Sequence, residues 1–385
     1  MPDVDSRADR KAIADTAVRE ALSTMTWSAP SERAYREEDL IGKTLAGRYR
    51  LKRILGQGGM GAVFEAVDLE TQDSVAVKLI LIQELMNKST RLRFEQEAKA
   101  ARGVQDDYVV RLLDSGSDGK LGTPFIVMEL LHGEDLSDAL DRVGAMDPRT
   151  VAKIGIHVCR GLHAAHEQKI IHRDIKPANI FLTESRDGEI LAKICDFGIA
   201  KHGGPDDALR SAALTLTGSL LGTPTYSAPE QAMNPKEVDG RSDVWSLCLA
   251  LYKAISARRI WPRVETIPQL LVWICTHDVR PLLKVAPWVE PELAAIIHRG
   301  IHRDPAKRWD DVKQLEVALL EWLGQDATIK SDELRPVDAT RREAAISQAP
   351  EVADEEVGGT LVFAATEASA PAGAEEPNRG FDRSA

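Results

Sequence analysis

The chain has 385 residues, which is enough for two domains or for one two-lobed domain with tails. Its 49 Lys and Arg residues against 60 Asp and Glu residues give a formal net charge of −11, which argues against general binding to nucleic acids or anionic membranes and favours protein partners. The longest apolar run, residues 244–257, is too short for a membrane span, and the four cysteines lack the C-x-x-C spacing of a zinc site or a disulfide framework, so we expect a soluble protein of the reducing cytoplasm.

Residues 1–44 combine small and charged side chains with weak periodicity, which predicts a flexible N-terminal extension. Order is expected to begin near Leu45, where alternating apolar residues start a strand over 48–55. A glycine-rich turn then joins this strand to a second one over 62–68. Because glycine has no Cβ, the backbone at Gly56, Gly58 and Gly61 can close over phosphates and present its amides to them.

The G-x-G-x-x-G spacing of this turn also occurs in dinucleotide-binding folds and in ordinary hairpins. A strand follows the glycines here, whereas a Rossmann fingerprint needs a helix, and no G-K-[ST] follows as a P-loop would require. In the phosphate-binding interpretation, Val63 would lie over a flat base.

The next predicted strand, 74–80, is an apolar run interrupted by Lys78, and an interior lysine needs an acidic partner or an anion. The predicted helix over 90–102 offers two such partners, Glu95 and Glu97. Strands over 108–113 and 125–128 complete a small sheet. From Leu136 the pattern becomes helical, and the apolar stripe of 150–168 predicts a buried helix.

Residues 172–179, His-Arg-Asp-Ile-Lys-Pro-Ala-Asn, bring a base, two cations and a metal ligand into one loop. Asp174 can receive a hydroxyl proton, Lys176 can balance charge on a phosphate in transfer, and Asn179 can ligate Mg²⁺. A polar surface turn after an apolar helix is the plain alternative. Asp196-Phe197-Gly198 follows a predicted hairpin over 180–194, and a polar stretch leads from there to Ala228-Pro229-Glu230.

Together these motifs resemble the Hanks-type (eukaryotic-like) bacterial serine/threonine protein kinases, over about residues 45–323. The resemblance implies an α+β, bilobal protein-kinase fold, with a small five-stranded N-lobe with helix C (45–128), a hinge (129–133) and a larger helical C-lobe (134–323). It implies ATP-dependent transfer of the γ-phosphoryl group to Ser or Thr hydroxyls of proteins, with Asp174 and Lys176 as catalytic residues. Asn179 and Asp196 would hold Mg²⁺, or Mn²⁺ in its place.

The resemblance also assigns an ATP site and prefers Glu97 over Glu95 as the partner of Lys78, because residues 93–98 resemble the R-F-x-x-E-A stretch of such kinases. Backbone groups of Glu129 and Leu131 would meet the adenine edge. The residues assigned to ATP are Leu55, Gly56, Gly58, Gly61, Val63, Ala76, Lys78, Glu97, Met128, Glu129 and Leu131.

Regulation is expected in the activation segment, residues 199–230. Arg173, next to Asp174, suggests that a phosphate added there is bound and orders the loop. Thr215 and Thr217 are the candidate autophosphorylation sites, with a transient homodimer as the reacting species, and Thr223 together with Lys176 marks Ser/Thr specificity. The resemblance further predicts that Arg308 pairs with Glu230, and that an Asp of the buried helix to which residues 239–247 belong anchors the backbone of the catalytic loop.

Three departures from the family pattern concern packing around helix C: Cys248 stands where many kinases have Gly, Ala101 is small, and no His-Pro precedes Tyr108. Two other functions compete, a nucleotide-binding scaffold of the same fold and a small-molecule kinase. The intact set of charged residues argues against the first, and the segment 222–230 argues against the second. Residues 324–385 are poor in aromatic residues and predict a disordered acidic tail.

Overall fold

The structure is a computed structural model, and it describes residues 36–58, 61–80, 88–119, 121–185, 187–197, 224–234, 238–264 and 266–348. Several sequence-based predictions lie outside these ranges: the extension over 1–35, the threonines Thr215, Thr217 and Thr223, and the tail over 349–385. Within the described ranges no helix has the length and apolar character needed to cross a bilayer.

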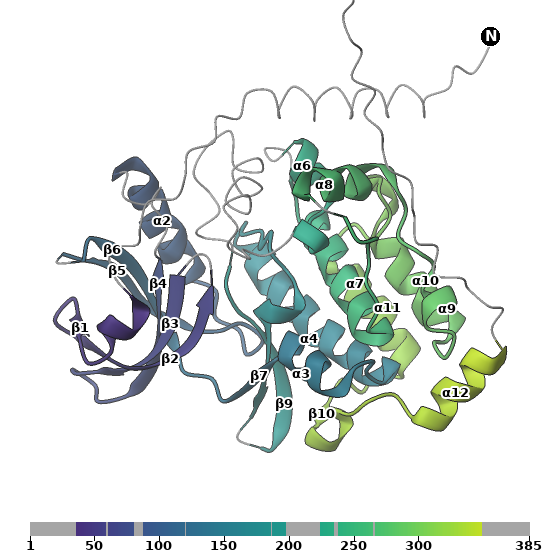
Figure 1. The fold of residues 1–385 in the computed structure, drawn as a ribbon, viewed down its shortest axis with the longest axis horizontal. Helices are drawn as coiled ribbons and strands as arrows, with labels where there is room; N and C mark the ends of the chain where they lie inside the picture. The colour runs from purple at the N-terminus through teal and green to yellow at the C-terminus, as the bar shows by residue number, and fades with distance from the viewer. Residues whose placement is uncertain are drawn as a thin grey trace, which may run out of the picture. The chain divides into compact units, whose positions relative to one another are not determined.

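An antiparallel sheet of six strands forms the N-terminal part (Figure 1), in the order β1-β2-β3-β4-β6-β5. Its strands are β1 (Thr44–Leu45), β2 (Tyr49–Gly58), β3 (Gly61–Asp68), β4 (Ser74–Ile80), β5 (Leu112–Asp118) and β6 (Thr123–Glu129). The five predicted strands are present, and the two-residue β1 is added to them. Apolar and β-branched residues of β4 and β6 are buried, which explains why these strands lie inside the sheet.

Two boundaries of this part differ from the prediction. The strand expected over 108–113 begins only at Leu112, because Val110 donates its N–H to the carbonyl of Ile194 and so pairs with the C-terminal part instead. Order also begins before Leu45: the short helix η1 (Glu37–Leu40) precedes β1, and Leu40 is buried in the core of the sheet.

Helix α2 (Lys88–Ala101) corresponds to the predicted helix C and packs against β5. Its buried residues Phe94, Ala98 and Ala101 join the apolar cluster that also contains Met128 and Phe197. The small Ala101 is therefore part of a packed core, although the family usually has a larger side chain there.

The C-terminal part is mostly helical (Figure 1). Its helices are α3 (Leu136–Val143), α4 (Pro148–Glu167), η3 (Pro177–Asn179), η5 (Pro224–Tyr226), α6 (Pro229–Met233), α7 (Arg241–Ser256), α8 (Ile267–Thr276), α9 (Leu282–Val285), α10 (Pro291–Gly300), η7 (Pro305–Lys307), α11 (Val312–Leu323), η8 (Ser331–Glu333) and α12 (Ala339–Gln348). The predicted helix over 150–168 is confirmed as α4. Asp147 caps its first turn by accepting a hydrogen bond from Arg149 N–H.

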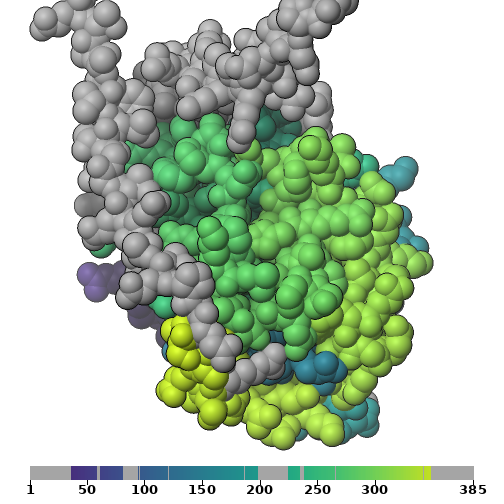
Figure 2. All heavy atoms as spheres, turned by 90° about the vertical axis from the view of Figure 1, so that its right-hand side faces the viewer, coloured from purple at the N-terminus to yellow at the C-terminus, as the bar shows by residue number. Residues whose placement is uncertain are grey.

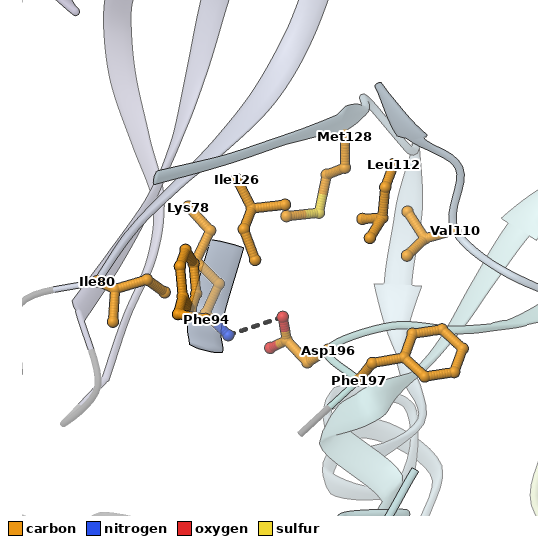
Figure 3. A pocket seen from close by; sticks show the side chains of 9 residues that line it. All are labelled: Lys78, Ile80, Phe94, Val110, Leu112, Ile126, Met128, Asp196 and Phe197. Carbon is orange, nitrogen blue, oxygen red and sulfur yellow. Dashed lines mark ion pairs between the residues drawn. The ribbon is translucent and has the colours of Figure 1, made fainter. Parts of the chain in front are cut away.

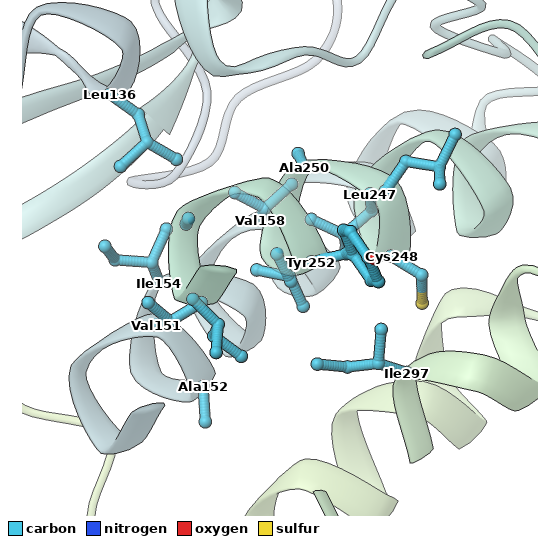
Figure 4. Close-up of a cluster of buried hydrophobic side chains, with 14 of the residues drawn as sticks. Leu136, Val151, Ala152, Ile154, Val158, Leu247, Cys248, Ala250, Tyr252 and Ile297 are labelled. Atoms are coloured by element: carbon cyan, nitrogen blue, oxygen red, sulfur yellow. The ribbon is translucent and has the colours of Figure 1, made fainter. Parts of the chain in front are cut away.

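The core of this part forms where α4 meets α7 and α10. Figure 4 shows Val158 of α4, Tyr252 of α7 and Ile297 of α10 among its members. Cys248 also lies here, and a Cβ on Gly300 would fall 2.2 Å from its Sγ atom. The thiol at the position where many kinases have Gly is thus accommodated by a glycine on the facing helix.

A second sheet has the order β10-β9-β8-β7, with strands β7 (Gly133–Asp135), β8 (Ile180–Glu184), β9 (Glu189–Ile194) and β10 (Ile329–Lys330). The predicted hairpin is confirmed as β8 and β9. The prediction of disorder from residue 324 is wrong for 324–348, which contain β10, η8 and α12. Its physical reason is burial, since Ala327, Ile329 and Val337 are apolar residues packed in the core of the C-terminal part.

Candidate active site

Strand register brings most of the predicted ATP-site residues together. Across β2 and β3, Gly56 lies opposite Val63 and Gly58 lies opposite Gly61. Across β3 and β4, Val63 then lies opposite Lys78. Three predicted glycines, one valine and one lysine thus occupy one continuous stretch of the sheet.

The apolar residues predicted to face a base share one cluster. Ala76 lies opposite Met128 in the pairing of β4 with β6, and both are buried. Val63 and Leu131 are partly buried and pack against the same cluster. Leu55, by contrast, is 39% exposed, as a residue at the mouth of a site would be. These residues can form an apolar slot for a flat ring.

One of the backbone groups of the hinge residue Glu129 is already hydrogen-bonded within the protein. Its N–H donates to the carbonyl of Arg111 at 3.0 Å, so its carbonyl is the group that could meet the adenine edge. The Glu129 side chain accepts hydrogen bonds from Arg111 N–H and from Lys193 Nζ, each at 2.9 Å. Lys193 lies on β9, so this ion pair joins the hinge to the hairpin, which the sequence analysis did not foresee.

The structure pairs Lys78 with Asp196. The Nζ atom of Lys78 lies 2.7 Å from Oδ1 of Asp196, as Figure 3 shows. Glu97 lies on α2 and is partly buried, and its pairing with Lys78 stays a prediction. The sequence analysis weighed only Glu95 and Glu97 as partners and assigned Asp196 to the metal, although an aspartate can also offset the cost of burying the lysine.

The charge of Asp196 is maintained by its surroundings. Burial raises the pKa of this carboxyl, but the neighbouring ammonium groups of Lys78 and Lys176 act in the opposite direction, and the net pKa lies below its ordinary value. Asp196 is therefore ionised at neutral pH, which is the state that a cation ligand requires.

An apolar pocket adjoins this ion pair, and Figure 3 shows that Phe94 of α2 lies beside the Lys78 side chain. The sequence analysis used residues 93–98 only to find the glutamate and missed Phe94 itself. Its position directly after Arg93 in the R-F-x-x-E pattern was the available signal. The pocket is lined by Lys78, Ile80, Phe94, Val110, Leu112, Ile126, Met128, Asp196 and Phe197.

The catalytic loop holds three predicted residues within hydrogen-bond distance. Lys176 Nζ lies 2.9 Å from Oδ2 of Asp174. The side-chain amide of Asn179 donates to the same oxygen at 3.1 Å and to the backbone carbonyl of Asp174 at 2.7 Å. The carboxylate is thus oriented by an ammonium group and an amide from its own loop.

Asp243, on α7, holds the backbone of this loop. It is fully buried, and its carboxylate accepts hydrogen bonds from the N–H groups of His172 and Arg173, both at 2.8 Å. The predicted anchor of the catalytic loop is therefore confirmed. Arg173 has φ 62°, a left-handed conformation that is unfavourable for a residue with a side chain, and the Asp243 bond supports it.

The end of the activation segment is tied to the same core. Gln231 of α6 donates from its side chain to the carbonyl of Arg173 at 2.9 Å. The predicted pairing of Arg308 with Glu230 is confirmed: two hydrogen bonds of 2.6 and 2.8 Å join the guanidinium to the carboxylate. The Gln231 contact was not predicted, since nothing in the sequence marks it.

Cys195, directly before Asp196, is a further titratable group of the site. Burial raises the pKa of its thiol above the ordinary value, so it is protonated at neutral pH. Cys195 therefore acts as a small apolar side chain and not as a reactive thiol.

The donor set near the loop fits a magnesium ion. Mg²⁺ is commonly bound by one or two carboxylates together with phosphate oxygens and water, and Asp196 and Asn179 offer a carboxylate and an amide. The N–H of Cys195 bonds to the carbonyl of Asn179 at 2.9 Å, which brings the two donors close together. Within the described residues no group of three or more His, Cys, Asp or Glu side chains could hold a metal ion.

Comparison with known proteins agrees with this site. Residues 49–318 match the protein kinase domain family. The serine/threonine-protein kinase PknA of Mycobacterium tuberculosis is 34% identical over 272 residues, which cover 70% of this chain and 60% of PknA. A probable serine/threonine-protein kinase of Corynebacterium efficiens is 33% identical over 293 residues, which cover 74% of this chain and 43% of that protein. The chain thus spans less than two thirds of the length of these relatives.

Among solved structures, the PknI kinase domain of M. tuberculosis is 26% identical and superposes with a TM-score of 0.57, covering 74% of this chain and 98% of that domain. The family match covers more than half of the chain and includes every motif of the site just described. The chain therefore belongs to the protein kinase domain family, and the relatives that it resembles are bacterial serine/threonine-protein kinases.

Proposed function

We propose that the protein transfers the γ-phosphoryl group of ATP to Ser or Thr hydroxyls of protein substrates. The observation that carries this proposal is the meeting of Asp174, Lys176 and Asn179 in one hydrogen-bonded group, with Asp196 ionised beside Lys78. Phosphoryl transfer requires little covalent work from the protein, so positioned charges of this kind can supply the rate.

Each residue has a role that its surroundings support. Asp174, held by Lys176 and Asn179, would orient the substrate hydroxyl and accept its proton. Lys78 would hold the α- and β-phosphates, and Asp196 and Asn179 would hold the metal. Mg²⁺, or Mn²⁺ in its place, would neutralise charge on the phosphates when bound.

The nucleotide would lie between the glycine-rich strands and the apolar slot. Gly56, Gly58 and Gly61 would present backbone amides to the phosphates. The remaining assigned residues, which would contact the base or position Lys78, are Leu55, Val63, Ala76, Glu97, Met128, Glu129 and Leu131.

We further propose activation by autophosphorylation at Thr215 and Thr217 in a transient homodimer, with Arg173 binding the new phosphate. The link from Gln231 to the carbonyl of Arg173 supports this, because a change in the activation segment would reach the catalytic loop directly. Thr223 would contribute to Ser/Thr specificity. A cytoplasmic location is supported by the four cysteines, all of which are free thiols.

Purified full-length protein incubated with Mg²⁺ and labelled ATP tests the proposal, beside an Asp174→Asn control. We expect label only in the wild type, with mass spectrometry locating it at Thr215 and Thr217. Labelling confined to other residues would reject the proposed sites but keep the activity. Absence of label with any protein substrate, despite measurable ATP binding, would instead favour a nucleotide-binding scaffold.

A further inference from the structure

The segment that follows α11, residues 324–337, adds a strand to the hairpin that leads to Asp196. We call this segment the C-terminal strap. Its strand β10 pairs antiparallel with β9, with Ile329 opposite Ile190 and Lys330 opposite Glu189. The strap lies beyond residues 49–318, which match the kinase family, so membership of the family does not imply these contacts.

The strap is fixed to the C-terminal part at its far end. Lys153 of α4 is buried, and its Nζ atom lies 2.8 and 3.0 Å from the two carboxylate oxygens of Glu333. The Thr150 hydroxyl donates to the carbonyl of Glu333, and Val337 N–H donates to the carbonyl of Ala145. Figure 2 shows the chain beyond the strap, in yellow, lying against the body of this part. These bonds hold the strap against the C-terminal part.

His157 of α4 contacts β9 next to the strap. Its Nδ1 atom accepts a hydrogen bond from Ala192 N–H at 3.3 Å. The backbone of Ala327, in the strap, lies near the ring and acts to raise its pKa, against the larger effect of burial. The imidazole packs against Tyr108, with ring centroids 4.6 Å apart. One buried side chain therefore has a hydrogen-bond partner in the hairpin and a neighbour in the strap.

From β9 the backbone leads directly to the metal-binding residue. Ile194 N–H donates to the carbonyl of Tyr108 at 2.8 Å, and Cys195 N–H donates to the carbonyl of Asn179 at 2.9 Å. Asp196 then has φ 57°, a left-handed conformation that persists only where flanking contacts hold it. The position of this carboxylate thus depends on how firmly β9 is held.

We propose that the C-terminal strap is a positioning segment for Asp196: β10 on the edge of β9, together with the hydrogen bond that His157 accepts from Ala192 N–H, fixes the backbone that presents the metal-binding carboxylate. This inference rests on the proposed function, in which Asp196 holds Mg²⁺. Contacts that orient a metal ligand typically change metal affinity or activity by about 10- to 100-fold when they are removed. The strap should therefore act on the metal dependence of the reaction and not on binding of the protein substrate.

Two variants of the full chain test the strap. His157→Phe keeps a ring against Tyr108 but removes the hydrogen bond from Ala192 N–H, and Ile329→Ala truncates a buried residue of β10. Ile297→Ala is the matched control, because it makes the same truncation at an equally buried position of α10. For each variant, the Mg²⁺ concentration at half-maximal phosphotransfer, the KM for a protein substrate and hydrogen exchange at the Ala192 and Ile194 amides are measured.

We expect His157→Phe and Ile329→Ala to raise the half-maximal Mg²⁺ concentration about 10-fold and to accelerate exchange in β9, with the KM for the protein substrate unchanged. Ile297→Ala should lower the melting temperature without either effect. Active variants with the wild-type Mg²⁺ dependence would overturn the inference, and so would unchanged exchange in β9. If the wild type transfers no phosphate, the proposed function fails, and the inference fails with it only if β9 exchange is also unchanged.

Discussion

Arg308 and Glu230, 78 positions apart in the sequence, form a bidentate ion pair in which the arginine side chain is fully buried. The same guanidinium also donates to the backbone carbonyls of Arg241, His302 and Arg303. Glu230 ends the activation segment, so this pair fixes where that segment returns to the helical core. A buried ion pair of this kind fixes the position of the chain around it, because separating the two charges would leave each of them buried without a partner.

Removal of the cation should destabilise the fold strongly. We expect Arg308→Met to lower the free energy of unfolding by about 3–5 kcal/mol, because the Glu230 carboxylate and three backbone carbonyls lose their donor. Urea unfolding of the full chain measures this. Arg53→Gln is the control, since Arg53 pairs with Glu65 on the surface and its loss should cost less than about 1 kcal/mol. Equal costs for the two variants would contradict the role given to Arg308.

Asp243 should matter more for the rate than its distance from the reacting groups suggests. In Asp243→Asn the side-chain NH₂ cannot accept the hydrogen bond from His172 or Arg173 N–H, so the backbone of the catalytic loop is released on one side. A misplacement of about 1 Å can reduce a rate about 100-fold, and we expect a fall in kcat of that order with little change in the KM for ATP. Steady-state kinetics test this, and a variant that loses only ATP affinity would refute it.

Lys78 and Asp196 should prove coupled in stability as well as in activity. Their side chains are 16% and 35% exposed, so the ion pair is neither fully buried nor fully at the surface. A double-mutant cycle with Lys78→Met and Asp196→Asn should therefore give a coupling energy of about 1–3 kcal/mol. Thermal or urea unfolding provides the four free energies. Additive effects would show that the pair makes no net contribution, and the expected loss of activity in both single variants gives a separate readout.

The motifs of the site were predictable because phosphoryl transfer needs particular residue types at fixed spacings. Asp174, Lys176 and Asn179 lie in one loop, so their meeting follows from the sequence alone. The pairing of Lys78 with Asp196 did not follow, because it depends on how the hairpin lies against the sheet. Spacing along one element is visible in a sequence, whereas the distance between two elements is not.

The C-terminal strap is ordered although its sequence predicted disorder. Residues 324–348 have the small and charged residues of a disordered tail, and only the isolated apolar positions Ala327, Ile329 and Val337 become buried. A two-residue strand such as β10 is too short to show the alternation of apolar and polar residues by which a strand is recognised in a sequence. The strap is ordered by contacts with Lys153 and His157, which lie well over a hundred residues earlier.

His157 should make stability depend on pH. Burial, reinforced by the nearby charge of Arg160, lowers the pKa of this imidazole from 6.5 to about 4 in the folded chain. Because the folded pKa lies below the unfolded one, the unfolded chain binds the proton first as the pH falls. Its contribution to stability is therefore complete above pH 6.5 and is lost progressively towards pH 4.

Between pH 7 and pH 5 this group alone should reduce the free energy of unfolding by about 2 kcal/mol. His157→Phe should remove this part of the pH dependence, so the free energy of unfolding of the variant should fall less between pH 7 and pH 5 than that of the wild type. His172, which is buried, and His298, which is partly buried, also have lowered pKa values, so part of the dependence should remain. Urea unfolding at both pH values measures the difference, with His163→Gln on the exposed side of α4 as the control. If His157→Phe and the wild type lose the same stability on acidification, His157 is not held neutral by its burial and by the nearby charge of Arg160.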